Sequence, residues 1–270
     1  MLPKKTYGEW LQEAKKALNK ANIPSAHLDA LLLLEQISSK KKEILLTYPD
    51  TFIGRNQLRK LNKLLKKRSE HIPLAYLVNK KEFYGREFYV SNKVLVPRPE
   101  SESFISLLEK ISFSKKQKMV DLGTGSGILA ITVKSLHPSW DVVATDISKN
   151  ALTVARKNAK GFGLDIRFTK SNLFNSIDND FDIITANLPY VPTTLKVLEE
   201  VMNEPSVAVF SGEDGLALYR ALLASTFKKD AYLLLESLLT QQDEIKALAK
   251  ENGFKLIDKE NLVLVFKKIK

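Results

Sequence analysis

The spacing of apolar positions changes along this chain of 270 residues. Over roughly the first 75 residues they recur every three or four positions, which predicts amphipathic helices. Beyond residue 100, short runs of strand-forming residues alternate with helical patterns, which predicts an α/β domain around a mostly parallel sheet. Between the two lies a stretch with a period of two, typical of a β-hairpin. The predicted organisation is a helical domain over residues 1–78, a hairpin linker over 79–98 and an α/β domain over 99–270.

Helices with short breaks are predicted in the amino-terminal domain. Thr6 starts a capping-box pattern for the first helix, and Pro24-Ser25 opens the second, in which Leu28 is among the expected core positions. Two more helices are expected over residues 41–46 and 56–69. The last of these is expected to turn its leucines inward and to present the basic residues Arg59, Lys60, Lys63, Lys66, Lys67 and Arg68 on its outer face.

Seven strands are predicted in the α/β domain, each from a short apolar run. Four residues separate the last two, which is too short for the crossover that parallel strands need. The final strand should therefore run antiparallel to an otherwise parallel sheet. The predicted strands lie near residues 118–121, 142–145, 166–169, 181–186, 232–235, 254–257 and 262–266.

The segments that link the domains carry their own signals. Phe83 and the run Phe88–Val90 predict a hairpin that turns near Gly85-Arg86. Pro97-Arg98-Pro99 fixes an extended segment, because proline stops a helix and restricts the residue before it. This segment is the expected junction of the two domains. Arg98 is expected to anchor one domain to the other, with a substrate or cofactor contact as the alternative.

Composition excludes several kinds of site. The chain has no cysteine, so disulfides, thiolate metal sites and a cysteine nucleophile are all excluded. Its three histidines are scattered without metal-ligand spacing, and no metal site is expected. The first ten residues lack an apolar signal core, and no apolar run approaches the length of a membrane span. A soluble cytoplasmic protein is therefore expected.

Charge is unevenly distributed along the chain. The net charge is +11, and the first 90 residues hold 18 basic against 9 acidic side chains, whereas the remaining 180 hold 24 against 22. A basic amino-terminal third is consistent with docking to an acidic macromolecule. It is equally consistent with plain solvation of a helical domain, and charge does not decide between the two.

The tetrapeptide Asn187-Leu188-Pro189-Tyr190 follows the predicted strand over residues 181–186. Proline cannot donate to a sheet ladder, so the strand must stop here. Open α/β sheets bind ligands beyond the carboxyl ends of their strands. A short loop at this place can hold one side-chain amide and one or two backbone carbonyls in fixed positions, which suits a substrate that carries an NH2 group. An ordinary polar turn is the alternative.

The segment Asp121–Gly127 contains three glycines and opens a helix after the first predicted strand. Glycines let the backbone approach a ligand closely, and a helix start offers unpaired N–H groups. The spacing differs from the fingerprint that binds a dinucleotide pyrophosphate.

Asp146 ends the next strand, where a carboxylate can accept hydrogen bonds from both hydroxyls of a ribose. Its alternative role is to cap the helix that begins at Ser148. Together the two signals favour a ribose-bearing cofactor without a diphosphate, and S-adenosylmethionine fits that description.

In this order, Asp121–Gly127, Asp146 and Asn187–Tyr190 resemble the motifs of class I S-adenosylmethionine-dependent methyltransferases. More closely, nearly the whole chain resembles the protein-(glutamine-N5) methyltransferases that modify peptide chain release factors, the HemK or PrmC family. The further motifs that carry this resemblance are His71–Leu77, Glu82–Gly85, Val96–Glu100, Glu204-Pro205 and Ser211–Arg220.

The resemblance implies a Rossmann-like class I fold with a seven-stranded, mostly parallel sheet whose last strand is antiparallel, preceded by a small helical domain and a β-hairpin linker. It implies an enzyme that transfers a methyl group from S-adenosyl-L-methionine to a glutamine amide nitrogen in the GGQ motif of a release factor. A monomer is expected. No membrane or obligate nucleic-acid partner is implied. The helical domain would help to engage the release factor.

Site residues follow from the motifs and the resemblance together. Asn187 and a backbone carbonyl at Leu188 or Pro189 are expected to accept both hydrogens of the substrate amide and to aim its nitrogen at the methyl group, while Tyr190 packs against the substrate. Catalysis is assigned to Asn187, Pro189 and Tyr190, and substrate binding to these with Leu188. The expected cofactor contacts are Gly123, Thr124, Gly125, Ser126, Gly127, Asp146, Asn172, Leu173 and Asn187.

Three departures from the family pattern stand out. Leu188 replaces a proline, Ser171–Leu173 replaces an acidic and often aromatic stretch, and Leu235–Ser237 lacks a common glycine. The first departure is the form that resembles ribosomal RNA adenine dimethyltransferases, so a nucleic-acid adenine methyltransferase is the alternative enzyme. A cofactor-free binding module on the same fold is an alternative from another class.

Overall fold

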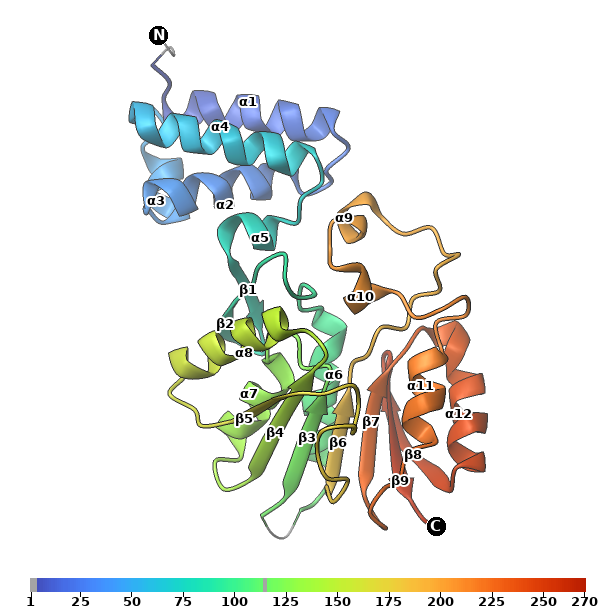
Figure 1. Ribbon diagram of the computed structural model, residues 1–270. Coiled ribbons are helices and arrows are strands. Elements are labelled where there is room, and N and C mark those ends of the chain that lie inside the picture. Colours follow the sequence, from blue (N-terminus) through green and yellow to red (C-terminus); the bar gives the residue numbers. More distant parts are fainter. Residues whose placement is uncertain (1–3, 114–115) are drawn as a thin grey trace. The chain divides into compact units, whose positions relative to one another are not determined.

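The computed structural model describes residues 4–113 and 116–270, so residues 1–3 of the predicted helical domain and residues 114–115 of the predicted α/β domain lie outside it. By its contacts the chain divides into two units (Figure 1). The smaller unit comprises residues up to Asn79 together with Leu198–Asn203, and the larger comprises Lys80–Val197 with Glu204–Lys270.

The smaller unit is helical, as the pattern predicts. Thr6 caps the first helix with a capping box, since its hydroxyl accepts from the Glu9 N–H while the Glu9 carboxylate accepts from the Thr6 N–H. The side chains of Trp10, Leu18 and Leu33 are fully buried between the helices. The helices are α1 (Tyr7–Lys20), α2 (Ala26–Ser38), α3 (Lys42–Thr47), α4 (Arg55–Ser69), α5 (Leu74–Val78) and α9 (Glu199–Met202).

Two predicted side-chain orientations in this unit are wrong. Leu28 is 50% exposed, because it is turned by about 200° from the buried positions Ala26 and Ala30. Arg68 is 3% exposed and does not lie on the outer face of α4. It follows the buried Leu61 by seven residues, about two helical turns, and so shares its face.

A hairpin and seven strands organise the described part of the larger unit. In the hairpin, β1 (Lys80–Phe83) pairs antiparallel with β2 (Arg86–Tyr89). The sheet has the order β5-β4-β3-β6-β7-β9-β8, and β9 runs antiparallel to both neighbours, which confirms the prediction for the final strand. Its strands are β3 (Lys118–Leu122), β4 (Asp141–Asp146), β5 (Arg167–Lys170), β6 (Ile183–Ala186), β7 (Tyr232–Glu236), β8 (Phe254–Glu260) and β9 (Val263–Lys268).

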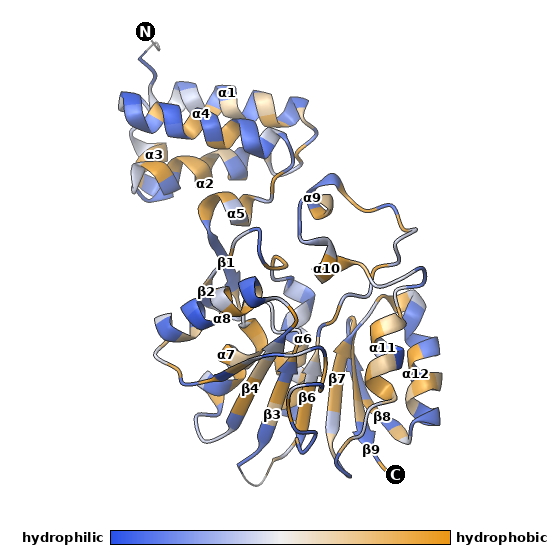
Figure 2. Ribbon diagram, in the orientation of Figure 1, coloured by the Kyte–Doolittle hydropathy of each residue, from blue (hydrophilic) through white to orange (hydrophobic). Residues whose placement is uncertain are grey.

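Helices cover both faces of this sheet (Figure 1). Alternate strand residues enter different cores. Met119 and Ile183 pack on the side of α6 (Ser103–Lys110) and α7 (Ile128–Leu136), whereas Val120 and Ile184 pack on the side of α11 (Ala217–Leu223) and α12 (Gln242–Glu251). This explains why the central strands β6 and β7 are apolar almost throughout (Figure 2). The helical elements are η1 (Pro99–Glu102), α6 (Ser103–Lys110), α7 (Ile128–Leu136), α8 (Lys149–Gly161), α10 (Ser206–Val209), α11 (Ala217–Leu223), η2 (Leu239–Gln241) and α12 (Gln242–Glu251).

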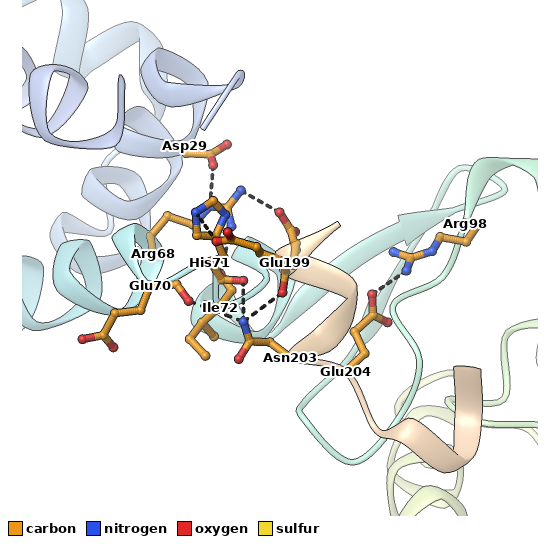
Figure 3. Close-up of polar contacts among 10 residues, drawn as sticks. Asp29, Arg68, Glu70, His71, Ile72, Arg98, Glu199, Asn203 and Glu204 are labelled. Atoms are coloured by element: carbon orange, nitrogen blue, oxygen red, sulfur yellow. Dashed lines mark hydrogen bonds and ion pairs between the residues drawn. The ribbon is translucent and has the colours of Figure 1, made fainter. Parts of the chain in front are cut away.

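The segment Pro97-Arg98-Pro99 lies inside the larger unit, and the chain passes from one unit to the other at Asn79-Lys80. The Arg98 guanidinium is paired with the carboxylate of Glu204, which belongs to the same unit (Figure 3). Arg98 therefore anchors the segment that contains Glu204. This ion pair lies within one unit, so it is not the anchor between domains that the sequence predicted. None of the described helices combines the length and the apolar character that crossing a bilayer requires.

Candidate functional site

The strand order reverses at β3 and β6, which lie side by side although the chain makes β4 and β5 between them. Such a switch point leaves a crevice at the carboxyl ends of the strands, where α/β sheets bind ligands. A cavity of about 410 Å³ lies there, within the larger unit. Its volume is in the range of small-molecule sites. The loops after β3, β4, β5 and β6 all contribute to its lining.

The glycine loop after β3 forms one wall of the cavity through Gly123, Thr124, Gly125 and Ser126. Gly123 has a φ of +70°, and a Cβ there would stand 3.0 Å from the Leu188 side chain. Glycine is therefore required where this loop meets the loop after β6. Gly127 does not line the cavity: a Cβ there would stand 2.9 Å from Ile131 within α7, so this glycine lets the helix start pack closely.

Asp146 faces the cavity from the end of β4. Its two oxygens accept hydrogen bonds from the backbone N–H groups of Gly125, at 3.0 Å, and of Ser148, at 2.8 Å. Ser148 caps α8 with its own hydroxyl. Each carboxylate oxygen keeps a second lone pair for a ligand, and burial raises the pKa of Asp146.

Asp121 lies in β3 just before the glycine loop, lines the cavity and is 1% exposed. Its oxygens accept from the hydroxyls of Thr124, at 2.6 Å, and Thr185, at 2.8 Å. Burial raises the pKa of Asp121 to about 6, although both hydroxyl contacts oppose this shift. The carboxylate thus ties the loop after β3 to the neighbouring strand β6.

The loop after β5 brings Asn172 and Leu173 to the cavity. Leu173 has a φ of +48°, and its carbonyl accepts from the Ser171 hydroxyl at 2.7 Å. The hydroxyl also accepts from the Ser176 N–H at 3.0 Å. A buried serine therefore holds the turn that presents these two side chains.

Asn187 lines the same cavity as the glycine loop and Asp146. Its Nδ2 donates to the Ser101 hydroxyl at 2.9 Å and to the Glu236 carboxylate at 3.2 Å. The two acceptor oxygens are themselves 2.7 Å apart, so they hold Nδ2 from one side, and Oδ1 is the acceptor that this side chain can offer to a ligand. Oδ1 can accept a hydrogen bond from an NH2 group in the cavity.

The rest of the tetrapeptide divides between the cavity and the protein interior. Leu188 and Pro189 line the cavity, and Leu188 is buried against the glycine loop. Tyr190 is not among the lining residues: its hydroxyl donates to Glu236 at 2.8 Å, and its carbonyl accepts from the Gln241 side chain at 2.8 Å. The structure therefore places Tyr190 as a support of the loop.

Four residues that support the site were not predicted: Ser101, Glu236, Tyr219 and Gln241. They come from η1, the end of β7, α11 and η2. The sequence does contain a signal that could have identified Glu236 as a site residue. It is a charged residue at the carboxyl end of an apolar strand, just as Asn187 is a polar residue directly after one. Tyr219 is buried within hydrogen-bonding distance of the carbonyls of Leu188 and Glu236, so its hydroxyl joins the two strand ends.

Two family models together match most of the chain. The model described as "Methyltransferase small domain" matches residues 101–257, and that described as "PrmC N-terminal domain" matches residues 9–78.

Among the described residues, no cluster of three or more acidic or histidine side chains is placed to hold a metal ion.

Relatives match the chain across both predicted domains. It is 35% identical over 217 residues to a release factor glutamine methyltransferase of Deinococcus radiodurans, with 79% of this chain and 78% of the relative covered. It is 33% identical over 283 residues to a bifunctional methyltransferase of Rickettsia felis, with 91% of this chain covered. That alignment covers 54% of the relative, so the chain spans about half its length.

A solved 16S rRNA methyltransferase of Thermus thermophilus, in complex with AdoMet and guanosine, has the same fold. The TM-score is 0.52 at 16% identity, and the alignment covers 71% of this chain and 50% of that structure. At this identity the similarity concerns the fold, which is the class I methyltransferase fold.

Proposed function

Since the chain belongs to the family of release factor glutamine methyltransferases, we propose that it transfers a methyl group from S-adenosyl-L-methionine to the side-chain amide nitrogen of a glutamine in a peptide chain release factor. The observation that carries this proposal is the Asn187 carboxamide, which lines one cavity with the glycine loop and Asp146 while its NH2 group is held from behind.

The residues around the cavity fit this cofactor. Asp146 can accept from ribose hydroxyls with its remaining lone pairs, and the backbone at Gly123 and Gly125 leaves room for close approach. Asn172 and Leu173 line the cavity from the loop after β5, the strand that pairs with β4, and would hold the adenine. Thr124, Ser126 and Gly127 complete the proposed binding loop, with Gly127 acting through the packing of α7. When bound, S-adenosylmethionine supplies an activated methyl group on a sulfonium.

The chain's own contribution to the chemistry is positioning. A glutamine amide nitrogen is a poor nucleophile, because its lone pair is delocalised into the carbonyl, so orientation toward the methyl group is the main task. Asn187 Oδ1 and a backbone carbonyl of Leu188 or Pro189 accept the two amide hydrogens. The same acceptors would stabilise positive charge as it develops on the nitrogen, which then loses a proton to solvent, while the cofactor leaves as the neutral thioether S-adenosylhomocysteine. Tyr190 holds this loop in place through its hydroxyl contact with Glu236.

The substrate is proposed to be the glutamine of a GGQ motif, bound by a monomeric enzyme in the cytoplasm, where release factors act. The helical unit, whose family model is the amino-terminal domain of these enzymes, is proposed to help engage the release factor. The alternative substrate is an adenine amine in ribosomal RNA, which offers a similar delocalised nitrogen.

One assay tests these assignments. The protein is incubated with S-adenosylmethionine labelled with tritium in its methyl group, together with a release factor, the same factor with its GGQ glutamine changed to alanine, or ribosomal RNA. Label is expected in the unchanged release factor and in neither of the others. Label in the RNA would establish the alternative enzyme, and label in none of the three would contradict both.

A further inference from the structure

Glu236 is a buried carboxylate that the register of two neighbouring strands places beside the Asn187 carboxamide. Ala186 of β6 pairs with Leu235 of β7, so the next residues, Asn187 and Glu236, leave the two strands side by side. Ala186 and Leu235 both enter the core on the side of α11 and α12. Because side chains alternate along a strand, Asn187 and Glu236 both turn away from that core.

The Glu236 carboxylate is held by hydrogen-bond donors from separate segments. Oε1 accepts from the Tyr190 hydroxyl at 2.8 Å. Oε2 accepts from the Ser101 hydroxyl at 2.7 Å and from Asn187 Nδ2 at 3.2 Å. Ser101 also accepts from Nδ2, so the three side chains form a closed triangle. Glu236 and Ser101 are each 1% exposed, which keeps water from replacing these contacts.

A carboxylate accepts hydrogen bonds and cannot donate them. If the Asn187 carboxamide turned over, its Oδ1 would face the Glu236 oxygen with no hydrogen between them. In a buried site this costs the hydrogen bond and adds repulsion between two acceptors. We propose that Glu236 is a positioning residue: it fixes the Asn187 carboxamide in the one orientation that directs Oδ1 to the substrate amide.

The proposal also explains the motif around Arg98. Pro99 starts the 3-10 turn η1, and this turn carries Ser101 into the triangle. Arg98 is paired with Glu204, and that carboxylate also accepts from the Val96 N–H at 2.8 Å. The extended proline segment therefore serves to deliver one hydroxyl to the back of Asn187.

The inference rests on the proposed function for the nature of the substrate, so its test needs a readout that is independent of the substrate. The Asn187 side-chain NH2 signals are identified in a 15N-labelled protein by their loss in Asn187→Ala. In the unchanged protein the hydrogen that faces Ser101 and Glu236 is expected to exchange slowly with solvent, and its signal is expected to shift in Glu236→Gln. Rapid exchange, as for an exposed amide, would overturn the proposal whatever the enzyme methylates.

Kinetics of the isosteric variant Glu236→Gln supply the second readout. The new amide can donate to Oδ1 and so permits the inverted orientation of Asn187. With a release factor as substrate, kcat is expected to fall at least ~10-fold, while KM changes less than ~3-fold. Glu260→Gln is the matched control: Glu260 accepts from Ser106 and Lys110 and does not line the cavity, so its change should leave kcat intact.

A double-mutant cycle separates positioning from a purely structural role. If Glu236 acts through Asn187, Glu236→Gln should have little further effect on kcat in an Asn187→Ala background. Independent, multiplicative losses would overturn the proposal. Should Glu236→Gln fail to fold, the exchange measurement on the unchanged protein still tests the proposal. An unchanged protein that methylates no release factor, yet shows the protected amide, contradicts the proposed function and leaves this inference standing.

Discussion

At the scale of single residues, Asn187 carries the proposed chemistry, because it presents an acceptor to the cavity while its NH2 group is held by Ser101 and Glu236. Replacing it with alanine removes that acceptor. We expect Asn187→Ala to lower kcat for a release factor by ~10²-fold or more, as for other losses of oriented contacts. The measurement is tritium transfer under saturating substrate, with the thermal midpoint as a check of folding. A variant as active as the unchanged protein would contradict the mechanism.

Asp146 is expected to affect binding of the cofactor more than the chemical step. Asp146→Asn keeps the size of the side chain but removes the charge and replaces one acceptor oxygen by a donor. We expect the dissociation constant of S-adenosylhomocysteine to rise ~10-fold, which corresponds to the loss of about one hydrogen bond to a charged group. Isothermal titration calorimetry measures this constant. Equal affinity in the variant would show that Asp146 only holds the backbone of Gly125 and Ser148.

Asp121 makes stability depend on pH in an unusual direction. Its folded-state pKa is about 6 against an ordinary value of 3.8, so between these values the folded protein binds more protons than the unfolded chain. Its contribution to the free energy of unfolding therefore falls as the pH rises through this window. Asp121→Asn should remove that fall. Urea unfolding at about pH 4.5 and about pH 7.5, compared between the two proteins, tests the sign; an equal pH dependence would refute it.

Sequence reasoning found which residues gather at the site but not what holds them. Gly123, Asp146 and Asn187 lie at the carboxyl ends of strands that meet at one edge, so their meeting at one cavity follows from the fold class. Tyr190 points to Glu236 instead, because the direction of a side chain in a loop depends on partners that are distant in sequence. The spacing of residues within one motif contains no information about such partners.

At the scale of elements, the loop after β6 depends on a glycine far along the chain. Gly215 has a φ of +78°, and a Cβ there would stand 2.1 Å from the Tyr190 carbonyl oxygen. We expect Gly215→Ala to displace the loop and lower kcat/KM at least ~10-fold, with strain of ~1–3 kcal/mol. Gly163→Ala is the matched control, since Gly163 has a φ of +65° with open space around it. If both changes lowered kcat/KM equally, the backbone strain of an alanine at positive φ would explain the loss, and the contact of Gly215 with Tyr190 would not matter.

The strands and helices themselves could be predicted because apolar periodicity determines which residues are buried. The predicted run over residues 118–121 is observed as Lys118–Leu122, and that over 232–235 as Tyr232–Glu236. Arg68 shows where this reasoning fails: helical periodicity placed it on the face of Leu61, yet its charge suggested solvent. Burial of a charge requires a partner, and Asp29 lies 39 positions earlier in the sequence.

At the scale of the whole molecule, the segment Leu198–Asn203 belongs to the helical unit although the chain on either side of it belongs to the α/β unit. Arg68 donates to Glu200 at 2.8 Å. His71 pairs with Glu199 at 2.9 Å (Figure 3). The residues that follow this segment include Val207 and Phe210, which line the cavity. One continuous stretch of chain therefore serves both units, which no local pattern in the sequence predicts.

Arg68 is the residue on which this arrangement depends. Its guanidinium donates to the buried Asp29 at 2.6 Å and to the more exposed Glu200. Arg68→Ala leaves the Asp29 carboxylate buried without a cation, so we expect the free energy of unfolding to fall by about 3–5 kcal/mol. Glu200→Ala removes the exposed partner and should cost less than about 1 kcal/mol.

Unfolding by urea, followed through the fluorescence of Trp10 in a Trp140→Phe background, reports on the helical unit. Trp10 is buried there and Trp140 lies in the other unit, so the signal comes from one unit. The double variant Asp29→Leu with Arg68→Met should recover much of the stability, since replacing a buried ion pair by apolar side chains is often neutral. If Arg68→Ala cost no more than Glu200→Ala, the buried pair would not be what stabilises the helical unit.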